Sequence, residues 1–291
     1  MDREYLLGLE LNGSELNAGL VDLNGKVVKK LRQPIEPKAD KRKIIDAMVF
    51  AINKLRKEIV LGVGVGLPGI VDSKRGIVVE LPGRPGWRGL SLKKILEERI
   101  KLPVTIENAA NCFALAEYKV GFGRRMQNLL GVTVGDYVSS GVVLNGKLYK
   151  GNSELAGEFG HLSVDPTGPR CSCGGRGCLV SVSSSAAIRR ELGNALSKLS
   201  TRELTMLAKK DKRVRQAFES AARHLGKALA AAASLLNPDV IVLNGPVTSY
   251  EDFAKIAAAE AQRYAQLARK TPIVRSNLPD SGILGAASIV M

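Results

Sequence analysis

The chain is poor in aromatic residues and in cysteine, and each shortage excludes a class of protein. Tyr, Phe and Trp make up 4% of the 291 residues, too few for the stacking platforms that bind single-stranded nucleic acids. Of the four Cys, three fall within eight residues, unlike the even spread of a disulfide framework. No apolar run approaches the roughly 18 residues of a membrane span, and a basic-then-apolar secretory signal is missing at the start. We therefore expect a cytoplasmic protein with no membrane partner.

Acidic residues are also scarce. They number 28 against 43 Lys plus Arg, which gives a formal net charge of +15. Such an excess raises nucleic acid as a partner, because clustered cations attract phosphate groups. The basic clusters are short, however, and lie at residues 38–43, 124–125 and 209–215. With so few aromatic residues beside them, the charge favours a solvated basic surface over a dedicated nucleic-acid site.

One pattern of apolar runs and turns occurs twice in the chain. The first run begins at Leu6 and turns at residues 12–14 and 24–26; the second begins at Leu129 and turns at residues 135–136 and 145–147. Alternating runs joined by Asn-Gly are the strongest short-range signal for a β-hairpin. Each half of the chain is therefore predicted to begin with a β-meander.

Helical periodicity follows each meander. Apolar residues from Ile44 to Leu55 share one helical face after Asp40, a second helix is predicted after Ser91, and residues 217–236 form a long Ala/Leu-rich helix. Buried strands are predicted at residues 59–65, 104–107 and 240–243. This order predicts a duplicated α/β fold with two lobes and a cleft between them, where small ligands usually bind. Two unrelated α/β domains are the alternative.

The most specific local signal is a group of metal-ligand residues. His161 is followed by Cys171, Cys173 and Cys178, with glycines between the last two. Three thiolates and one imidazole suit a closed, tetrahedral Zn²⁺ site that leaves no position for a reactive water. The alternative is a set of free buried cysteines. A closed site of this kind stabilises a loop and does not hydrolyse a substrate.

Residues 156–161 and the CxCGxxGC run that follows resemble the signature of the ROK family (repressor, open reading frame, kinase). Further matching segments occur in the family's order at residues 66–72, 85–87, 102–108, 237–242 and 285–287. The resemblance covers nearly the whole chain and implies the duplicated actin-like, or ribonuclease-H-like, sugar-kinase fold. It also implies a dimer or tetramer. Within one chain, we expect one lobe of residues 1–108 plus 275–291 and a larger lobe of residues 109–274 that carries the zinc loop.

The enzymes of this family are ATP-dependent hexose and N-acetylhexosamine kinases, and the resemblance is weakest at their catalytic positions. Such a kinase needs a carboxylate that takes the proton of the attacking hydroxyl, together with Mg²⁺. In the family this carboxylate is the Asp after the Glu-Asn pair, and here that position is Ala109. A missing general base typically costs about 10²- to 10⁴-fold in rate.

The resemblance also implies three turns that would hold ATP. The implied nucleotide residues are Glu10, Gly13, Ser14, Gly135, Gly141 and Gly245. The first turn keeps an acid, a glycine and a hydroxyl. In the second, Tyr137, Ser139 and Ser140 stand where the family has glycine, so their side chains hinder close approach of the phosphates. Asp136 adds a negative charge that repels them. ATP and Mg²⁺ are therefore doubtful ligands.

The sugar pocket implied by the family is half kept. Asn108, Glu158 and His161 match residues that hydrogen-bond sugar hydroxyls, whereas Ala109, Val180 and Gly83 stand where other contacts are expected. Replacing buried acceptors by apolar groups changes which hydroxyls are satisfied. An alternative reading of Glu158 is a carboxylate that only orients the zinc loop.

Three hypotheses follow from these departures. The first is a zinc-stapled family member, a pseudoenzyme with impaired or lost phosphotransfer and a carbohydrate-binding cleft. The second is an active glucokinase-like enzyme with Glu107 or Glu158 as the base, although Glu107 should point to the opposite face of its strand from Asn108. The third is a nucleic-acid-binding regulator, for which the helix-turn-helix of regulatory members is missing before Tyr5. The combined departures favour the first.

Overall fold

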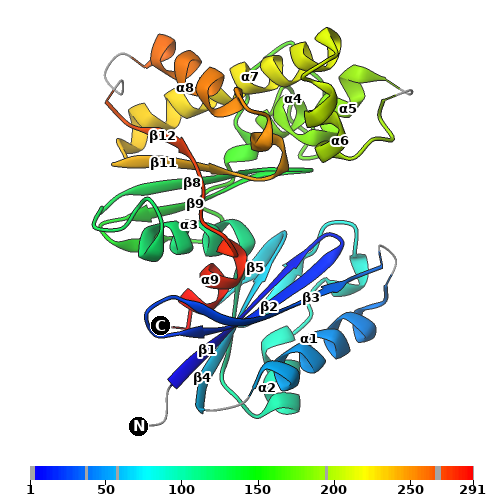
Figure 1. Cartoon of the computed structure of the whole chain (residues 1–291), viewed down its shortest axis with the longest axis vertical. Helices are drawn as coiled ribbons and strands as arrows, with labels where there is room; N and C mark the ends of the chain where they lie inside the picture. Colours follow the sequence, from blue (N-terminus) through cyan, green and yellow to red (C-terminus); the bar gives the residue numbers. More distant parts are fainter. Residues whose placement is uncertain (1–3, 37–38, 57–58, 194–195, 266–269, 291) are drawn as a thin grey trace. The chain divides into compact units, whose positions relative to one another are not determined.

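The computed structural model describes residues 4–36, 39–56, 59–193, 196–265 and 270–290. They form two compact units (Figure 1). Unit 1 comprises Met1–Arg124, Lys150–Ala156 and Leu278–Met291, and unit 2 comprises Arg125–Tyr149 and Gly157–Asn277. Each unit is built around one five-stranded sheet.

The sheet of unit 1 has the strand order β3-β2-β1-β4-β7. Its strands are β1 (Glu4–Asn12), β2 (Glu15–Asp22), β3 (Val27–Pro34), β4 (Ile59–Leu67) and β7 (Val104–Asn108). The first three form the predicted antiparallel meander, and β4 and β7 lie parallel to β1. A separate hairpin of β5 (Ile70–Asp72) and β6 (Ile77–Glu80) follows β4.

Helices cover both faces of this sheet. Successive side chains of a strand point to opposite faces of the sheet. On one face, Leu7 and Leu9 of β1 pack with the helices α1 (Lys41–Leu55) and α2 (Leu92–Ile100). On the other face, Leu6 packs with α3 (Ala109–Val120) and α9 (Ser281–Ser288). Asp40 begins α1 by accepting hydrogen bonds from the backbone N–H groups of the first turn. A short 3₁₀ helix, η1 (Pro85–Trp87), lies between β6 and α2.

Helix α9 lies directly on the sheet of unit 1. A Cβ atom at Gly8 would lie 2.0 Å from the carbonyl oxygen of Ile283, and one at Gly64 would lie 1.7 Å from that of Ala286. Only glycine allows two backbones to approach so closely. Helix α9 and strand β1, from opposite ends of the sequence, therefore pack in the same core.

The sheet of unit 2 repeats this plan with the order β10-β9-β8-β11-β12. Its strands are β8 (Leu129–Val134), β9 (Val138–Leu144), β10 (Lys147–Tyr149), β11 (Val240–Asn244) and β12 (Ile273–Arg275). Again three antiparallel strands come first, and β11 and β12 lie parallel to β8. The duplicated α/β architecture predicted from the two meanders is confirmed.

The helices of unit 2 gather on one side of its sheet (Figure 1). They are α4 (Leu179–Ser183), α5 (Ser185–Leu192), α6 (Thr201–Leu207), α7 (Lys212–Leu236) and α8 (Phe253–Tyr264), with the 3₁₀ helices η2 (Phe159–His161) and η3 (Pro246–Ser249). Helix α7 begins five residues before the predicted start at Ala217, because Asp211 caps it by accepting from the N–H groups of Arg213 and Val214 at 2.8 and 3.2 Å. The apolar pattern could not show this polar first turn.

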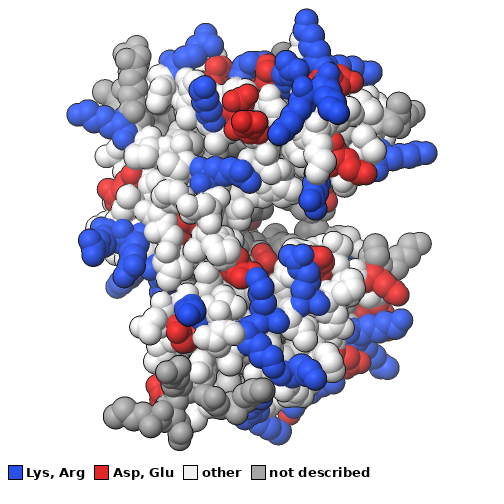
Figure 2. Space-filling model, viewed as in Figure 1, with Lys and Arg blue, Asp and Glu red and all other residues white. Residues whose placement is uncertain are grey.

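Charge and hydropathy of the described residues agree with a solvated basic surface. Figure 2 shows Lys and Arg side chains spread over the visible face of both units, with Asp and Glu among them. Within the described ranges, none of the helices combines the length and the apolar character that a bilayer crossing requires.

Candidate functional site

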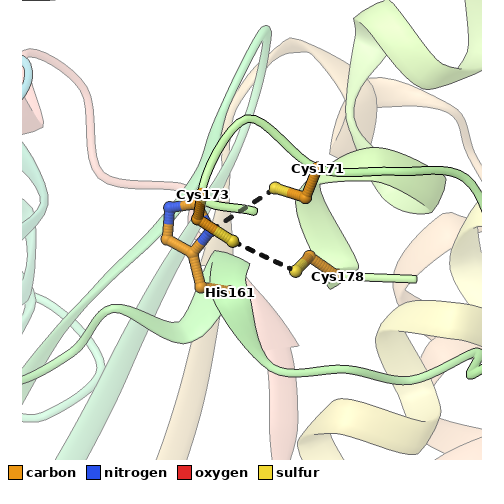
Figure 3. A group of neighbouring side chains, drawn as sticks. All are labelled: His161, Cys171, Cys173 and Cys178. Atoms are coloured by element: carbon orange, nitrogen blue, oxygen red, sulfur yellow. Dashed lines mark hydrogen bonds between the residues drawn. The ribbon is translucent and has the colours of Figure 1, made fainter. Parts of the chain in front are cut away.

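Unit 2 brings the four predicted metal ligands together. His161 ends η2, Cys171 and Cys173 lie in the loop that follows, and Cys178 stands directly before α4. Figure 3 shows their side chains converging, and their ligand atoms all lie within 4.8 Å of one another. Backbone bridges between Arg170 and Arg176 and between Ser163 and Cys178 hold the loop in this shape.

The dimensions of this His/Cys cluster fit a tetrahedral ion. The Sγ atoms of Cys173 and Cys178 are 3.6 Å apart, and Sγ of Cys171 is 3.6 Å from Nδ1 of His161. Metal–ligand bonds of about 2.3 Å for sulfur and about 2.0–2.1 Å for nitrogen give tetrahedral edges of about 3.8 and 3.6 Å. The cluster is therefore a candidate metal centre that needs little rearrangement to close around an ion.

The thiols of this cluster influence one another. Burial raises the pKa of Cys171, but hydrogen bonds from Cys173 and its neighbours outweigh that effect and lower it to about 7. Burial and the neighbouring thiols raise the pKa of Cys178 to about 12. The opposite shifts of Cys171 and Cys178 are the behaviour of closely spaced thiols, because like charges at short range disfavour each other.

Glu158 lies on the outer side of His161. Its Oε2 is 3.9 Å from Nε2 of the imidazole, while Nδ1 faces Cys171, and its side chain is 54% exposed. A carboxylate at the second ring nitrogen can orient an imidazole toward a metal. The geometry is compatible with that role and leaves the carboxylate open to solvent.

In unit 1, Asn108 forms the junction between β7 and α3. Its Oδ1 accepts from the N–H groups of Ala110 and Asn111 at 2.7 and 3.3 Å, and its Nδ2 donates to the carbonyl oxygen of Gly69 at 2.6 Å. Asn108 is thus the N-cap of α3. Ala109, the position of the missing carboxylate, is the first residue of that helix and is half-buried.

Glu107 is buried and fully engaged. It is 3% exposed, its Oε1 accepts from the Asn108 backbone at 2.8 Å and from Asn111 Nδ2 at 3.1 Å, and its Oε2 lies 2.6 Å from Lys150 Nζ. These contacts engage both oxygens of the Glu107 carboxylate. A carboxylate whose two oxygens already bind a cation and two donors is poorly placed to take a proton from a substrate.

The ion pair of Glu107 continues into a network that sequence reasoning missed. Lys150 also donates to Ser73 Oγ, and Ser73 donates to Glu154 Oε2 from its backbone N–H at 2.7 Å and from its hydroxyl at 3.0 Å. Glu154 adopts the left-handed conformation with φ of 60°, which is uncommon outside glycine. That unusual backbone is fixed by the network, and no local pattern in the sequence points to it.

The first predicted nucleotide turn lies between β1 and β2 in unit 1. Gly13 and Ser14 are exposed there, and a Cβ atom added at Gly13 would meet nothing within 4 Å. Glu10 lies deeper in β1, beside Gly282 of α9, where burial raises its pKa more than a hydrogen bond from Asn17 lowers it. Space for a ligand exists at Gly13, but the acid of this turn faces the protein interior.

The second predicted turn is shorter than expected. Strand β9 begins at Val138, so Ser139, Ser140 and Gly141 pair with β8 in the ladder, and only residues 135–137 form the turn. Ser140 is 5% exposed and donates to the carbonyl oxygen of Gly157 at 2.9 Å. The Ser140 hydroxyl is therefore occupied in holding the backbone of unit 2 together.

The third predicted nucleotide turn, at Gly245, lies beside this turn in unit 2. It has a φ of 105°, and a Cβ atom there would lie 2.4 Å from the carbonyl oxygen of Val134. A Cβ atom at Gly135 would lie 3.6 Å from Pro246. The structure thus brings the turns of Gly135 and Gly245 side by side, while Gly141 lies within the ladder.

The negative charge of Asp136 is neutralised by an arginine that the sequence pattern did not reveal. Arg189 Nη1 lies 3.0 Å from Asp136 Oδ1. Burial raises the pKa of Asp136, but hydrogen bonds from Ser185 and Arg189 outweigh it and lower that pKa. The expected repulsion of phosphate by an unpaired carboxylate is therefore replaced by an ion pair within unit 2.

The fold and the order of the motifs match one protein family. The family model described as "ROK family" matches residues 6–291. The chain belongs to the ROK family. Its sequence is 30% identical to the glucokinase of Thermotoga maritima, over 100% of this chain and 98% of that protein. It is also 30% identical to the xylose repressor of Bacillus subtilis, over 99% of this chain and 77% of the repressor.

A solved ROK structure extends this likeness to three dimensions. The ROK family glucokinase of Streptomyces griseus, in complex with glucose and AMPPNP, superposes with a TM-score of 0.86 at 27% identity and covers 98% of each chain. The predicted duplicated sugar-kinase fold is confirmed by this match. The present chain is thus a ROK protein with a sugar-kinase-like fold, whose relatives include kinases and repressors.

Proposed function

We propose that this ROK protein binds a carbohydrate on a sugar-kinase scaffold and has impaired or lost phosphotransfer. The observation that carries the proposal is Ala109 at the first position of α3, where its methyl group accepts no proton. The adjacent carboxylate of Glu107 is paired with Lys150 and accepts two further hydrogen bonds. Together these leave the start of α3 without a general base.

The proposed ligand is a hydroxylated sugar, and the candidate contact residues are Asn108 in unit 1 and, taken separately, Glu158 and His161 in unit 2. The capping bonds of Asn108 leave one Nδ2 hydrogen for a ligand, and the Glu158 carboxylate is open to solvent. The glucose complex of the Streptomyces griseus relative supports this ligand class. ATP with Mg²⁺ is not part of the proposal, and assembly into a dimer or tetramer rests on the family likeness.

The second part of the proposal is a structural zinc ion at the His/Cys cluster. His161, Cys171, Cys173 and Cys178 would hold it, and the ion would crosslink the loop between η2 and α4. Four protein donors complete a tetrahedron, so the site would leave no position for a catalytic water. Glu158 would then orient the imidazole of His161, in addition to any contact with a sugar.

An active sugar kinase is the second candidate function. The likeness to the Thermotoga maritima glucokinase favours it. The ion pair and hydrogen bonds of Glu107 disfavour that residue as the replacement base. The remaining candidate base is Glu158, whose exposed carboxylate has Oε2 3.9 Å from His161 Nε2.

The decisive assay is ATP-dependent phosphorylation of a panel of hexoses and N-acetylhexosamines with Mg²⁺. It should compare the native chain with Ala109→Asp, and with Ala109→Asn as a control of matched size that lacks a base. Sugar binding should be measured in parallel by calorimetry. Binding without turnover in the native chain supports the proposal. Turnover of about 1 s⁻¹ or more, the low end for kinases, would refute the lost phosphotransfer, and absence of sugar binding would refute the carbohydrate ligand.

A further inference from the structure

The turn after β8 contains a carboxylate seated in a set of hydrogen-bond donors. Asp136 Oδ1 accepts from the Ser185 hydroxyl and from Arg189 Nη1, the latter at 3.0 Å. The backbone joins the same elements, because the N–H of Ser185 donates to the carbonyl oxygen of Gly135 at 2.8 Å. The start of α5 is thereby fixed against the β8–β9 turn.

Arg189 is held in place from its other side. Its Nε donates to the carbonyl oxygen of Leu199 at 3.2 Å, and its Nη2 donates to Thr201 Oγ1 at 3.0 Å. The side chain of Arg189 is 25% exposed, whereas that of Asp136 is 69% exposed. The guanidinium is therefore a cation held in place by hydrogen bonds, and Asp136 is the more exposed member of the ion pair.

This arrangement is the one that a phosphate group would require. A guanidinium with a rigid, planar set of donors binds carboxylate and phosphate in similar ways. The neighbouring hydroxyl of Ser185 adds a further donor. All of these groups lie in unit 2, so the site does not depend on unit 1.

We propose that Ser185 and Arg189 form an anion-binding site and that the carboxylate of Asp136 occupies this site in place of a phosphate group. The inference deepens the proposed function and rests on it, since it gives a physical reason why the turn would bind no nucleotide phosphate. The site is stable without a ligand because its anion is covalently attached. Removal of the charge of Asp136 opens the site to pyrophosphate and to the phosphate tail of a nucleotide.

The test measures binding of inorganic pyrophosphate by calorimetry at low ionic strength. Asp136→Asn keeps the size of the side chain and removes its charge, and Asp136→Ser removes most of the side chain. Both are compared with the native chain and with the same changes combined with Arg189→Gln. Because a hydrogen bond to a charged group contributes enough for about a 10- to 100-fold change in affinity, we expect the single variants to bind pyrophosphate at least tenfold more tightly than the native chain. The Arg189→Gln combinations should lose this gain.

Thermal unfolding with and without pyrophosphate provides an independent measurement. The proposal predicts a lower midpoint for Asp136→Ser, restored by millimolar pyrophosphate, and no response of the native chain. Equal pyrophosphate affinity in the native chain and both single variants, or a gain that survives Arg189→Gln, would overturn the inference. AMPPNP in place of pyrophosphate shows whether a nucleotide tail also fits, and the sugar-phosphorylation assay of the native chain tests the proposed function separately.

Discussion

Lys150→Met should destabilise unit 1 more than any ordinary surface substitution. The change leaves the carboxylate of Glu107, which is 3% exposed, without its cation. Breaking a buried ion pair on one side costs about 3–5 kcal/mol, and because the Lys150 side chain is 30% exposed, solvent screening reduces this to about 2–3 kcal/mol. At about 2–4 °C for each kcal/mol, the thermal midpoint should fall by about 5–10 °C.

The assay is thermal unfolding followed by circular dichroism. Lys119→Met is the matched control, since Lys119 is also partly buried but donates to the carbonyl oxygen of Ser288 at 3.1 Å rather than to a carboxylate. Its midpoint should change by about 2 °C or less. The combination of Glu107→Gln with Lys150→Met should recover much of the loss, because no charge is left unpaired.

A fall no larger than that of Lys119→Met, or a double variant as unstable as Lys150→Met, would refute the reasoning. Either result would mean that water stabilises the charge of the Glu107 carboxylate without Lys150. Glu107 would then again be a candidate for the general base. The measurement therefore bears on catalysis as well as on stability.

Three further predictions concern the metal, the missing base and pH. Cys173→Ser should lose the zinc measured by atomic emission and unfold at a lower temperature. Ala109→Asp alone should not give an efficient kinase in a coupled ATP assay, whereas addition of Asp136→Asn should raise the rate. Because burial raises the pKa of Glu10, the native state binds its proton more tightly than the unfolded state, so stability should decrease as pH rises from about 4; Glu10→Gln should remove this decrease in urea unfolding.

Each of these predictions has an outcome that contradicts it. Cys112→Ser, a change of a buried thiol in α3 far along the chain from the His/Cys cluster, should keep its zinc, and equal zinc in Cys173→Ser would argue against the site. Rapid turnover by Ala109→Asp with Asp136 unchanged would show that the Asp136 carboxylate does not exclude phosphate. An unaltered pH profile in Glu10→Gln would assign the decrease to another group.

Local patterns predicted the parts of the structure that local chemistry determines. The Asn-Gly turns at residues 24–25 and 145–146 mark hairpins in both units, because two adjacent residues suffice to specify such a turn. The His/Cys spacing likewise predicted a cluster whose ligand atoms converge. Asp211 shows the limit of the apolar pattern, since a capping residue extended α7 over a polar turn.

The polar networks could not be predicted, because they join residues that are distant in the sequence. Ser73 and Glu154 are 81 positions apart, and Asp136 and Arg189 are 53 positions apart. A charged residue in a sequence motif shows no ion-pair partner when that partner is distant in the sequence and close only in the folded structure. For that reason Asp136 was interpreted from the sequence as a repulsive charge near phosphate, whereas the structure gives it a cation.

The position of α9 has a consequence for the order of folding during synthesis. At Gly8 and Gly64 the sheet is in close contact with a helix that the ribosome makes after residues 125–277. At about 5–20 residues per second, that interval lasts on the order of 10–30 s. Unit 2 is complete in the nascent chain before unit 1 is, and the apolar side chains of Leu6 and Val21 lack their α9 contacts meanwhile. The incomplete apolar face of the unit 1 sheet is therefore prone to aggregation until α9 has been synthesised.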